Sequence, residues 1–154
     1  MLIEVYRSVI QVNDTCFLFG HRTAEDRLLP EIEREAERLR SEYGIHEFII
    51  GNYGRFDRIA ASAIINLKKK YSDIRLTILL PNYRENAKLP DGFDAFLLPE
   101  GSERIPKRFS IVYANRSMIV QCDCIICYVH YIASNSYTLY QFARKRGKNI
   151  ILLQ

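Results

Sequence analysis

Four polar turns hold the residues of this chain that can do chemistry. The first, Gly20-His21-Arg22-Thr23, offers a guanidinium, an imidazole and a hydroxyl beside backbone amides. A phosphate gains about 0.3–1 kcal/mol at a helix N-terminus, and a charge-assisted hydrogen bond from Arg22 contributes about 1.5–3 kcal/mol more. A glycine directly after a strand also lets a ligand approach the backbone closely. The turn favours anion binding; alternatively, Thr23 only caps the next helix while His21 and Arg22 are solvated.

The second turn is Gly51-Asn52-Tyr53-Gly54-Arg55-Phe56-Asp57. Gly51 and Gly54 place no side chain in the path of a ligand, and Asn52 can both donate and accept hydrogen bonds. The GxxG spacing is a weak dinucleotide signal, and the lysine and hydroxyl of a Walker A motif are missing, so no cofactor is predicted. Asp57 falls in the first turn of a helix, where capping the helix and contacting a ribose hydroxyl are both open interpretations.

The third region, residues 98–108, supplies a carboxylate and a cation. Glu100 follows a strand, where it can act as a general base or bind sugar hydroxyls. Arg108 falls in the first turn of a helix, where the dipole disfavours a cation, so a phosphate or Glu100 would explain it as a partner. The same helix carries Asn115 and Arg116, for which ligand binding and hydrogen bonding at the core edge are the alternatives.

The last turn, Ala133-Ser134-Asn135-Ser136-Tyr137, is small and polar and precedes a helix. Ser134, Asn135 and Ser136 can each cap that helix, and their position also makes them a second anion cradle. Tyr137 would either stack on a base or pack against the core.

The cysteines are predicted to be reduced and structural. Cys16, Cys122, Cys124 and Cys127 fall in apolar, strand-like segments rather than in a short, loop-rich scaffold. Three close cysteines can indicate zinc or iron–sulfur ligation, but in a strand Cys124 and Cys127 point to opposite faces. We therefore expect core packing and no metal.

Alternating strand and helix signals position these turns. Short apolar runs predict strands at 16–19, 48–50, 75–80, 95–97, 123–129 and 149–153. Helical spacing predicts helices at 23–43, 56–67, 106–121 and 136–146. Strands that are apolar on both faces imply an α/β, Rossmann-like doubly wound fold, with a mostly parallel sheet flanked by helices on both faces. Such sheets bind ligands beyond the carboxyl ends of their strands, where the four turns fall. Residues 1–15 allow an added edge strand.

Length and composition exclude several classes of protein. The 154 residues suit one domain, and 48% hydrophobic with 26% charged residues exclude a disordered or low-complexity chain. No apolar run approaches the ~20 residues of a membrane span, and Glu4 and Arg7 interrupt any signal sequence, which predicts a cytoplasmic protein with no membrane partner. The net charge of +4 is spread along the chain, which disfavours nucleic acid as a partner. Apolar helix faces would equally serve the interface of a homo-oligomer.

Several ordered motifs together resemble one family. They are Phe19-Gly20-His21-Arg22, Gly51 to Asp57, Leu98-Pro99-Glu100-Gly101, Pro106-Lys107-Arg108-Phe109 and Asn115-Arg116-Ser117-Met118. This set resembles the YpsA-like branch of the SLOG superfamily, over nearly all of residues 16–153. The resemblance implies a Rossmann-like protein, related to the Lonely Guy phosphoribohydrolases and the DNA-binding DprA proteins, that binds a nucleotide-derived ligand at these turns. The Lonely Guy PGGxGTxxE loop is not matched, because Ser134 to Tyr140 stand there without its glycines and catalytic carboxylate.

Three functions follow as hypotheses. The leading one is a binding module for a nucleotide or nucleotide-derived small molecule, with phosphate at the Gly20 and Gly51 turns and at Ser134 to Ser136. The second is an N-glycosidase or phosphoribohydrolase acting on nucleoside monophosphates, with Glu100 or Asp57 as the catalytic carboxylate. The third is a DNA-associated protein like DprA, which the modest charge disfavours.

Overall fold

The computed structural model of the protein describes residues 14–154, so the edge strand predicted within 1–15 falls almost wholly outside the described residues. The strands are β1 (Thr15–Gly20), β2 (Glu47–Ile50), β3 (Arg75–Leu79), β4 (Ala95–Leu97), β5 (Cys124–Tyr128) and β6 (Asn149–Leu152). The α-helices are α2 (Leu29–Tyr43), α3 (Arg55–Lys70), α4 (Ser110–Gln121) and α5 (Asn135–Lys145). Short 3-10 helices are η1 (Asp26–Leu28), η2 (Ser102–Arg104) and η3 (Lys107–Phe109).

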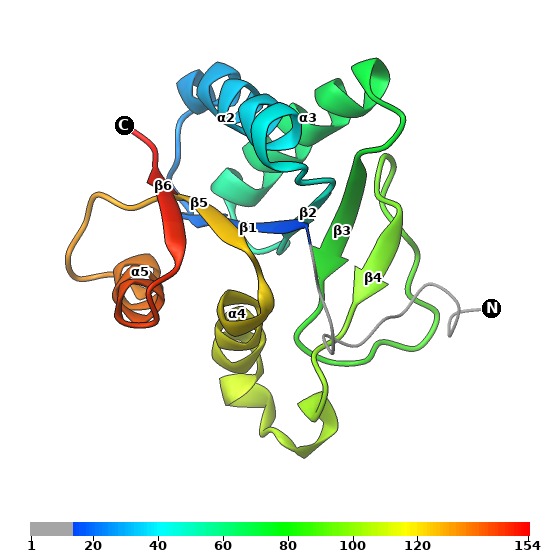
Figure 1. Ribbon diagram of the computed structural model, residues 1–154. Helices are drawn as coiled ribbons and strands as arrows, with labels where there is room; N and C mark the ends of the chain where they lie inside the picture. The colour runs from blue at the N-terminus through cyan, green and yellow to red at the C-terminus, as the bar shows by residue number, and fades with distance from the viewer. Residues whose placement is uncertain (1–13) are drawn as a thin grey trace.

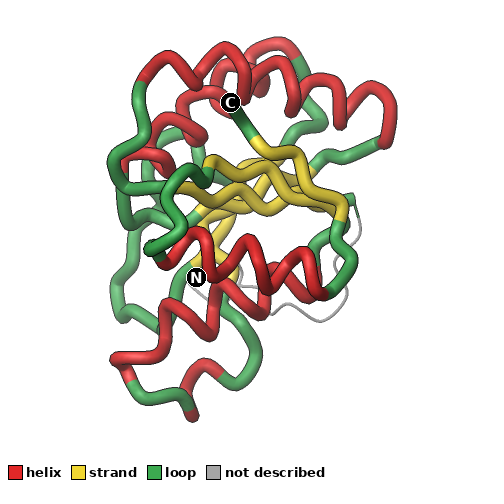
Figure 2. Tube along the Cα trace, turned by 90° about the vertical axis from the view of Figure 1, so that its left-hand side faces the viewer, coloured by secondary structure: helices red, strands yellow, loops and turns green. Residues whose placement is uncertain are grey.

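The six strands form one parallel sheet in the order β4-β3-β2-β1-β5-β6. Helices α2 and α3 cover one face, and α4 and α5 cover the other (Figures 1 and 2). This arrangement confirms the predicted doubly wound, Rossmann-like fold. The chain leaves β1 and β5, which are neighbours, toward opposite faces of the sheet. Their carboxyl ends therefore form the switch point at which such sheets bind ligands.

Strand residues alternate between two separate cores. In β1, Leu18 packs with α2 and α3, whereas Phe17 and Phe19 pack with α4 and α5. The same alternation places Cys124 and Cys127 in opposite clusters, which confirms the prediction that they point to opposite faces. Since both faces are buried, the register of the sheet is strongly specified, and the ends of the strands meet at one edge.

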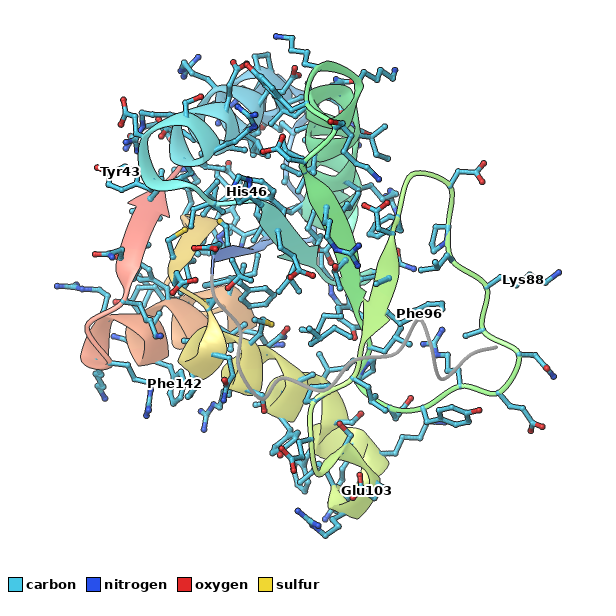
Figure 3. All side chains as sticks on the ribbon, turned by 45° about the vertical axis from the view of Figure 1, so that its right-hand side comes forward. Tyr43, His46, Lys88, Phe96, Glu103 and Phe142 are labelled. Carbon is cyan, nitrogen blue, oxygen red and sulfur yellow. The ribbon has the colours of Figure 1, made fainter. Side chains whose placement is uncertain are left out.

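The beginning of the first helix differs from the prediction. Thr23 is exposed and caps nothing, because a 3-10 turn over Asp26–Leu28 precedes α2, which begins at Leu29. Pro30 lacks an N–H and fits only the first turn of a helix, which sets this start. The helical spacing that predicts a helix at 23–43 also predicts that Tyr43 is buried, but Tyr43 is 65% exposed at the end of α2 (Figure 3).

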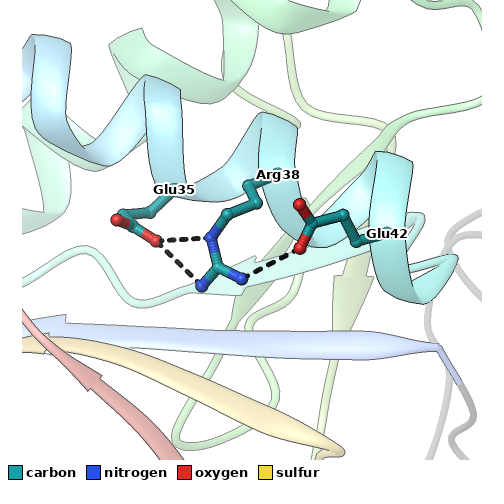
Figure 4. A network of polar contacts seen from close by, with 3 residues as sticks. All are labelled: Glu35, Arg38 and Glu42. Carbon is teal, nitrogen blue, oxygen red and sulfur yellow. Dashed lines mark hydrogen bonds and ion pairs between the residues drawn. The ribbon is translucent and has the colours of Figure 1, made fainter.

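The outer face of α2 is charged. Arg38 donates to Glu35 through Nε at 3.2 Å and to Glu42 through Nη1 at 3.2 Å (Figure 4). Such exposed pairs contribute little to stability, so this network belongs to the solvated surface. Within residues 14–154, no helix combines the length and apolar character that crossing a membrane requires.

Candidate functional site

A cavity of 230 Å³ opens at the carboxyl end of β1. The β2–α3 turn, the first turns of α4 and the N-terminus of α5 complete its wall. Residues from three of the four predicted turns line it, and Asn115 of α4 joins them: Gly20, His21, Arg22, Gly51, Gly54, Asp57, Asn115, Ser134, Asn135 and Ser136. The fold therefore gathers segments far apart in sequence at the switch point.

Four other predicted site residues lie outside this cavity. Asn52 is exposed and lines a neighbouring cavity, whereas Glu100 lines a separate cavity with Arg104 and Tyr113 of the η2–α4 region. The guanidinium of Arg108 lies 4.7 Å from the ring centre of Phe109, and that of Arg116 lies 5.0 Å from the ring centre of Phe142. A cation–π contact with a neighbouring phenylalanine thus accounts for the position of each guanidinium.

The separation of Glu100 has a structural cause. After β4, the chain runs through η2 and η3, which project away from the sheet before α4 returns to it (Figures 1 and 3, where Glu103 marks the projecting end). The Tyr113 hydroxyl donates to the Glu100 carbonyl oxygen at 2.6 Å and holds this turn. The pairing of Glu100 with Arg108 proposed from the sequence has no counterpart among the ion pairs of the described residues.

The glycines of the site make room for the protein's own side chains. A Cβ at Gly20 would lie 2.7 Å from the ring of Phe56, and one at Gly54 would lie 2.9 Å from the Cα of Arg22. A Cβ at Gly51 would lie 2.8 Å from the Tyr53 ring. Close packing of loops and helix therefore demands glycine at these positions, while the approach of a ligand to their backbone stays a prediction.

Asp57 holds the β2–α3 turn. Its Oδ2 accepts a hydrogen bond from the backbone N–H of Tyr53 at 2.9 Å, and Asp57 is the third residue of α3. Burial raises the pKa of the Asp57 carboxyl, while hydrogen bonds from the backbones of Tyr53 and Gly54 and the charge of Arg22 oppose that shift. This is the geometry of a capping carboxylate, and it supports the capping interpretation of Asp57.

The N-terminus of α5 is less occupied by internal hydrogen bonds. Ser134 caps it, since its Oγ accepts from Tyr137 N at 3.1 Å and donates to the Tyr131 carbonyl at 2.7 Å. The backbone N–H groups of Asn135 and Ser136, in the first turn, have no acceptor within the helix. At α3, by contrast, Arg55 N already donates to the Arg22 carbonyl. Of these two helix N-termini, that of α5 is therefore better able to bind an anion.

Several polar side chains at the cavity are free to bind a ligand. Within the described part of the chain, the side chains of Arg22, Asn115, Asn135 and Ser136 make no hydrogen bond with another residue. Together they offer a guanidinium, two amides and a hydroxyl around one space. Tyr137, in contrast, packs against the core beneath α4 and α5, and the centre of its ring lies 6.2 Å from that of Tyr140. Packing is therefore its role.

His21 connects the two strands of the switch point. Its ring Nε2 accepts from the backbone N–H of His130 at 2.6 Å and of Tyr131 at 3.2 Å, and the backbone N–H of His21 donates to the Tyr128 carbonyl at 3.2 Å. Two donors aimed at Nε2 require a lone pair there, so the ring is neutral with its proton on Nδ1. The side chain is only 5% exposed. Sequence reasoning missed this role because its partners are backbone groups 109 and 110 residues away.

The stability of the protein should depend on pH through His21. Burial, and secondly the charge of His130, lower the pKa of His21 below its ordinary 6.5. On acidification the unfolded chain binds the proton first, so the contribution of His21 is complete above pH 6.5 and is lost as pH falls toward the lower folded-state pKa. We expect wild type to exceed His21→Gln in free energy of unfolding by about 1 kcal/mol at pH 8, and by less at pH 5. A difference that stays constant over this range, in urea titrations, would contradict the prediction.

Tyr53 carries a buried hydroxyl without a hydrogen-bond partner among the described residues. Burial and the charge of Asp57 raise the pKa of this hydroxyl, so it stays protonated and able to donate. An unsatisfied buried group costs about 1–3 kcal/mol, so Tyr53→Phe should raise the stability of the free protein by about 1 kcal/mol. For a chain of this size that is about 2–4 °C in melting temperature. A calorimetric scan checks it; an unchanged or lower melting temperature would show that the hydroxyl is satisfied.

Comparison of the chain with models of known protein families and with curated proteins finds no match to either. The function is therefore argued from the chemistry of the cavity.

Proposed function

We propose that the protein binds a nucleotide or nucleotide-derived ligand, with a phosphate held between Arg22 and the N-terminus of α5. The observation that carries this proposal is the set of unused donors around one cavity at the switch point: the Arg22 guanidinium, the Ser136 hydroxyl and the first amides of α5. Phosphate needs several hydrogen-bond donors and a positive charge, and this set supplies both. In the Gly51 turn, the backbone N–H groups of Tyr53 and Gly54 already donate to Asp57. This turn therefore shapes the wall of the cavity and does not bind the phosphate.

The walls of the cavity suit the apolar part of such a ligand. Leu139 and Ile111 line it beside the polar groups, and Ile111 is 38% exposed at its mouth. At 230 Å³ the cavity lies below the ~300–1,000 Å³ of sites that enclose a drug-sized ligand. It therefore encloses the phosphate and its sugar, and leaves the base at the rim against Ile111. Asn115 and Asn135 are placed to bind sugar hydroxyls.

The alternative of an N-glycosidase or phosphoribohydrolase now depends on Asp57, because Glu100 faces another cavity. The backbone N–H groups of Tyr53 and Gly54 engage the Asp57 carboxylate, which favours a structural role. We therefore place binding ahead of catalysis. If the chain released free base from nucleoside monophosphates, and Asp57→Asn abolished that release while still binding the nucleotide, the enzyme would be the correct alternative. The SLOG relationship and the cytoplasmic location belong to the same proposal.

Calorimetric titration with a panel of nucleotides tests the proposal. The panel contains nucleoside mono-, di- and triphosphates, cyclic nucleotides and the matching unphosphorylated nucleosides. We expect one or more phosphorylated members to bind with the matching nucleoside at least tenfold weaker, because phosphate supplies the contacts with Arg22 and α5. The proposal fails if no member binds, or if nucleoside and nucleotide bind equally.

A further inference from the structure

The loop that joins β5 to α5 leads directly into the helix whose first residues line the cavity (Figure 1). This loop has little packing of its own, since residues 130–133 are all exposed. Among the described residues, the backbone hydrogen bonds of 130–133 go to two groups, the His21 ring and the Ser134 hydroxyl. The placement of the loop therefore depends on these two partners.

His21 and Ser134 form a continuous path from the end of β1 to α5. The lone pair of His21 Nε2 receives the N–H groups of His130 and Tyr131, and the ring centres of His21 and Tyr131 lie 4.7 Å apart. The Tyr131 carbonyl accepts from the Ser134 hydroxyl, and the same hydroxyl caps α5. Arg22, the cation of the proposed phosphate site, follows His21 in the chain. One imidazole thus connects the two parts of that site, Arg22 and the N-terminus of α5.

We propose that His21 positions the phosphate site, and that only its neutral ring does so, which makes ligand binding weaker in acid. The inference rests on the proposed function and adds the regulation of the same site. A proton on Nε2 would remove the lone pair and set a donor against two N–H donors. Both hydrogen bonds then break, and the loop no longer holds the amides of α5 opposite Arg22. Affinity is therefore complete at pH 8 and falls as the pH drops through the pKa of His21 in the free protein.

The sign of the pH effect separates this role of His21 from direct contact with the ligand. A protonated imidazole against the phosphate would strengthen binding in acid, whereas release of the loop weakens it. We expect weakening, because the loop engages Nε2 and the side chain is only 5% exposed. Burial and the charge of His130 also lower the pKa of His21, so the neutral ring prevails at pH 8. The titratable and charged groups that face the ring are Tyr128, His130 and Tyr131 on β5 and its loop, and Arg22 and Asp57 on the cavity wall.

Calorimetric titrations at pH 8 and pH 5, at one ionic strength, test the inference. The probes are adenosine 5′-monophosphate, guanosine 5′-monophosphate and the tightest-binding nucleotide of the panel. A monophosphate itself titrates in this range, so the readout is wild type relative to His21→Gln, for which the ligand titrates equally. The Gln amide oxygen can accept in place of Nε2 and does not titrate. We expect the affinity of wild type to fall about three- to tenfold more than that of His21→Gln.

Two further variants separate positioning from a general effect of losing a histidine. His21→Ala removes the acceptor, so it should bind about tenfold more weakly than wild type at pH 8, and Gln should restore most of that loss. The matched control is His46→Gln. His46 lies just before β2, at the other end of the strands from the cavity, and pairs with Asp73 at 2.9 Å (Figure 3). This control should keep the pH dependence of wild type.

Hydrogen exchange gives a second measurement that needs no ligand. In the free wild-type protein, the backbone N–H groups of His130 and Tyr131 should be protected at pH 8. Their protection factors, which already correct for the pH dependence of intrinsic exchange, should fall at pH 5. In His46→Gln the same fall should occur. Protection that is unchanged at pH 5 would show that protonation does not release the loop, and would overturn the inference whatever the ligand does.

The titrations distinguish failure of the inference from failure of the proposed function. A steeper loss of affinity in wild type than in His21→Gln, with wild-type behaviour in the control, supports the inference. Equal pH dependence in wild type and His21→Gln, or tighter binding of wild type at pH 5 than at pH 8, overturns it and leaves the proposed function standing. If no nucleotide of the panel binds wild type at pH 8, both fail.

Discussion

Arg22→Ala should lower nucleotide affinity by about 10- to 100-fold. The Arg22 guanidinium is the cation that lines the first cavity, and its side chain makes no hydrogen bond with another described residue. A hydrogen bond to a charged group is worth about 1.5–3 kcal/mol, which corresponds to this range of affinity. Stability should hardly change, because the backbone of Arg22, which receives Arg55 N and packs on Gly54, is retained.

Calorimetry with the best-binding nucleotide of the panel measures this effect. Arg34→Ala is the matched control, since Arg34 is an exposed arginine on α2, away from the cavity lining. We expect the control to bind as wild type does. Equal affinities for wild type and Arg22→Ala would remove the phosphate from its proposed position, even if binding itself were confirmed.

Gly20→Ala should destabilise the fold by about 1–3 kcal/mol, the cost of overpacking a core. The added Cβ would lie 2.7 Å from the ring of Phe56, which is the second residue of α3 and is fully buried. Neither the strand end nor the helix can move without disturbing the sheet. For a domain of this size, the melting temperature should fall by about 2–4 °C for each kcal/mol.

A double-mutant cycle with Phe56→Leu identifies the cause of that loss. Leu occupies less space than the ring, so Gly20→Ala should cost about 1 kcal/mol less in the Phe56→Leu background than in wild type. Urea unfolding of the four proteins gives the coupling energy. Additive effects of the two substitutions would show that the Phe56 contact is not what demands glycine at position 20.

Much of the fold follows from local patterns in the sequence. The alternation of short apolar runs with amphipathic segments predicts each of the six described strands within about two residues, because a doubly buried strand and a one-sided helix have different periods. The apolar residues whose spacing predicts the helix at 56–67 are all buried: Phe56, Ile59, Ala60, Ala63, Ile64 and Leu67. The position of the cavity also follows, because the carboxyl ends of parallel strands meet at one edge.

The details of the site depend on contacts that no local pattern contains. His21 was expected to face either a ligand or solvent, yet it receives two backbone N–H groups from beyond β5. Glu100 follows β4 as predicted, but the projecting 3-10 turns carry it to another cavity. Tyr53 was noted only as a turn residue, although it lines two cavities and its buried hydroxyl has no hydrogen-bond partner among the described residues. In each case the deciding neighbour lies far away in the sequence.

The structure of the protein with its best-binding nucleotide tests the central claim most directly. Our proposal predicts a phosphate group in the cavity at the end of β1, within hydrogen-bond distance of the Arg22 guanidinium and of the first amides of α5. Its base should lie at the rim beside Ile111. A nucleotide bound elsewhere on the molecule, or one whose base fills the cavity while its phosphate faces solvent, would contradict the proposal.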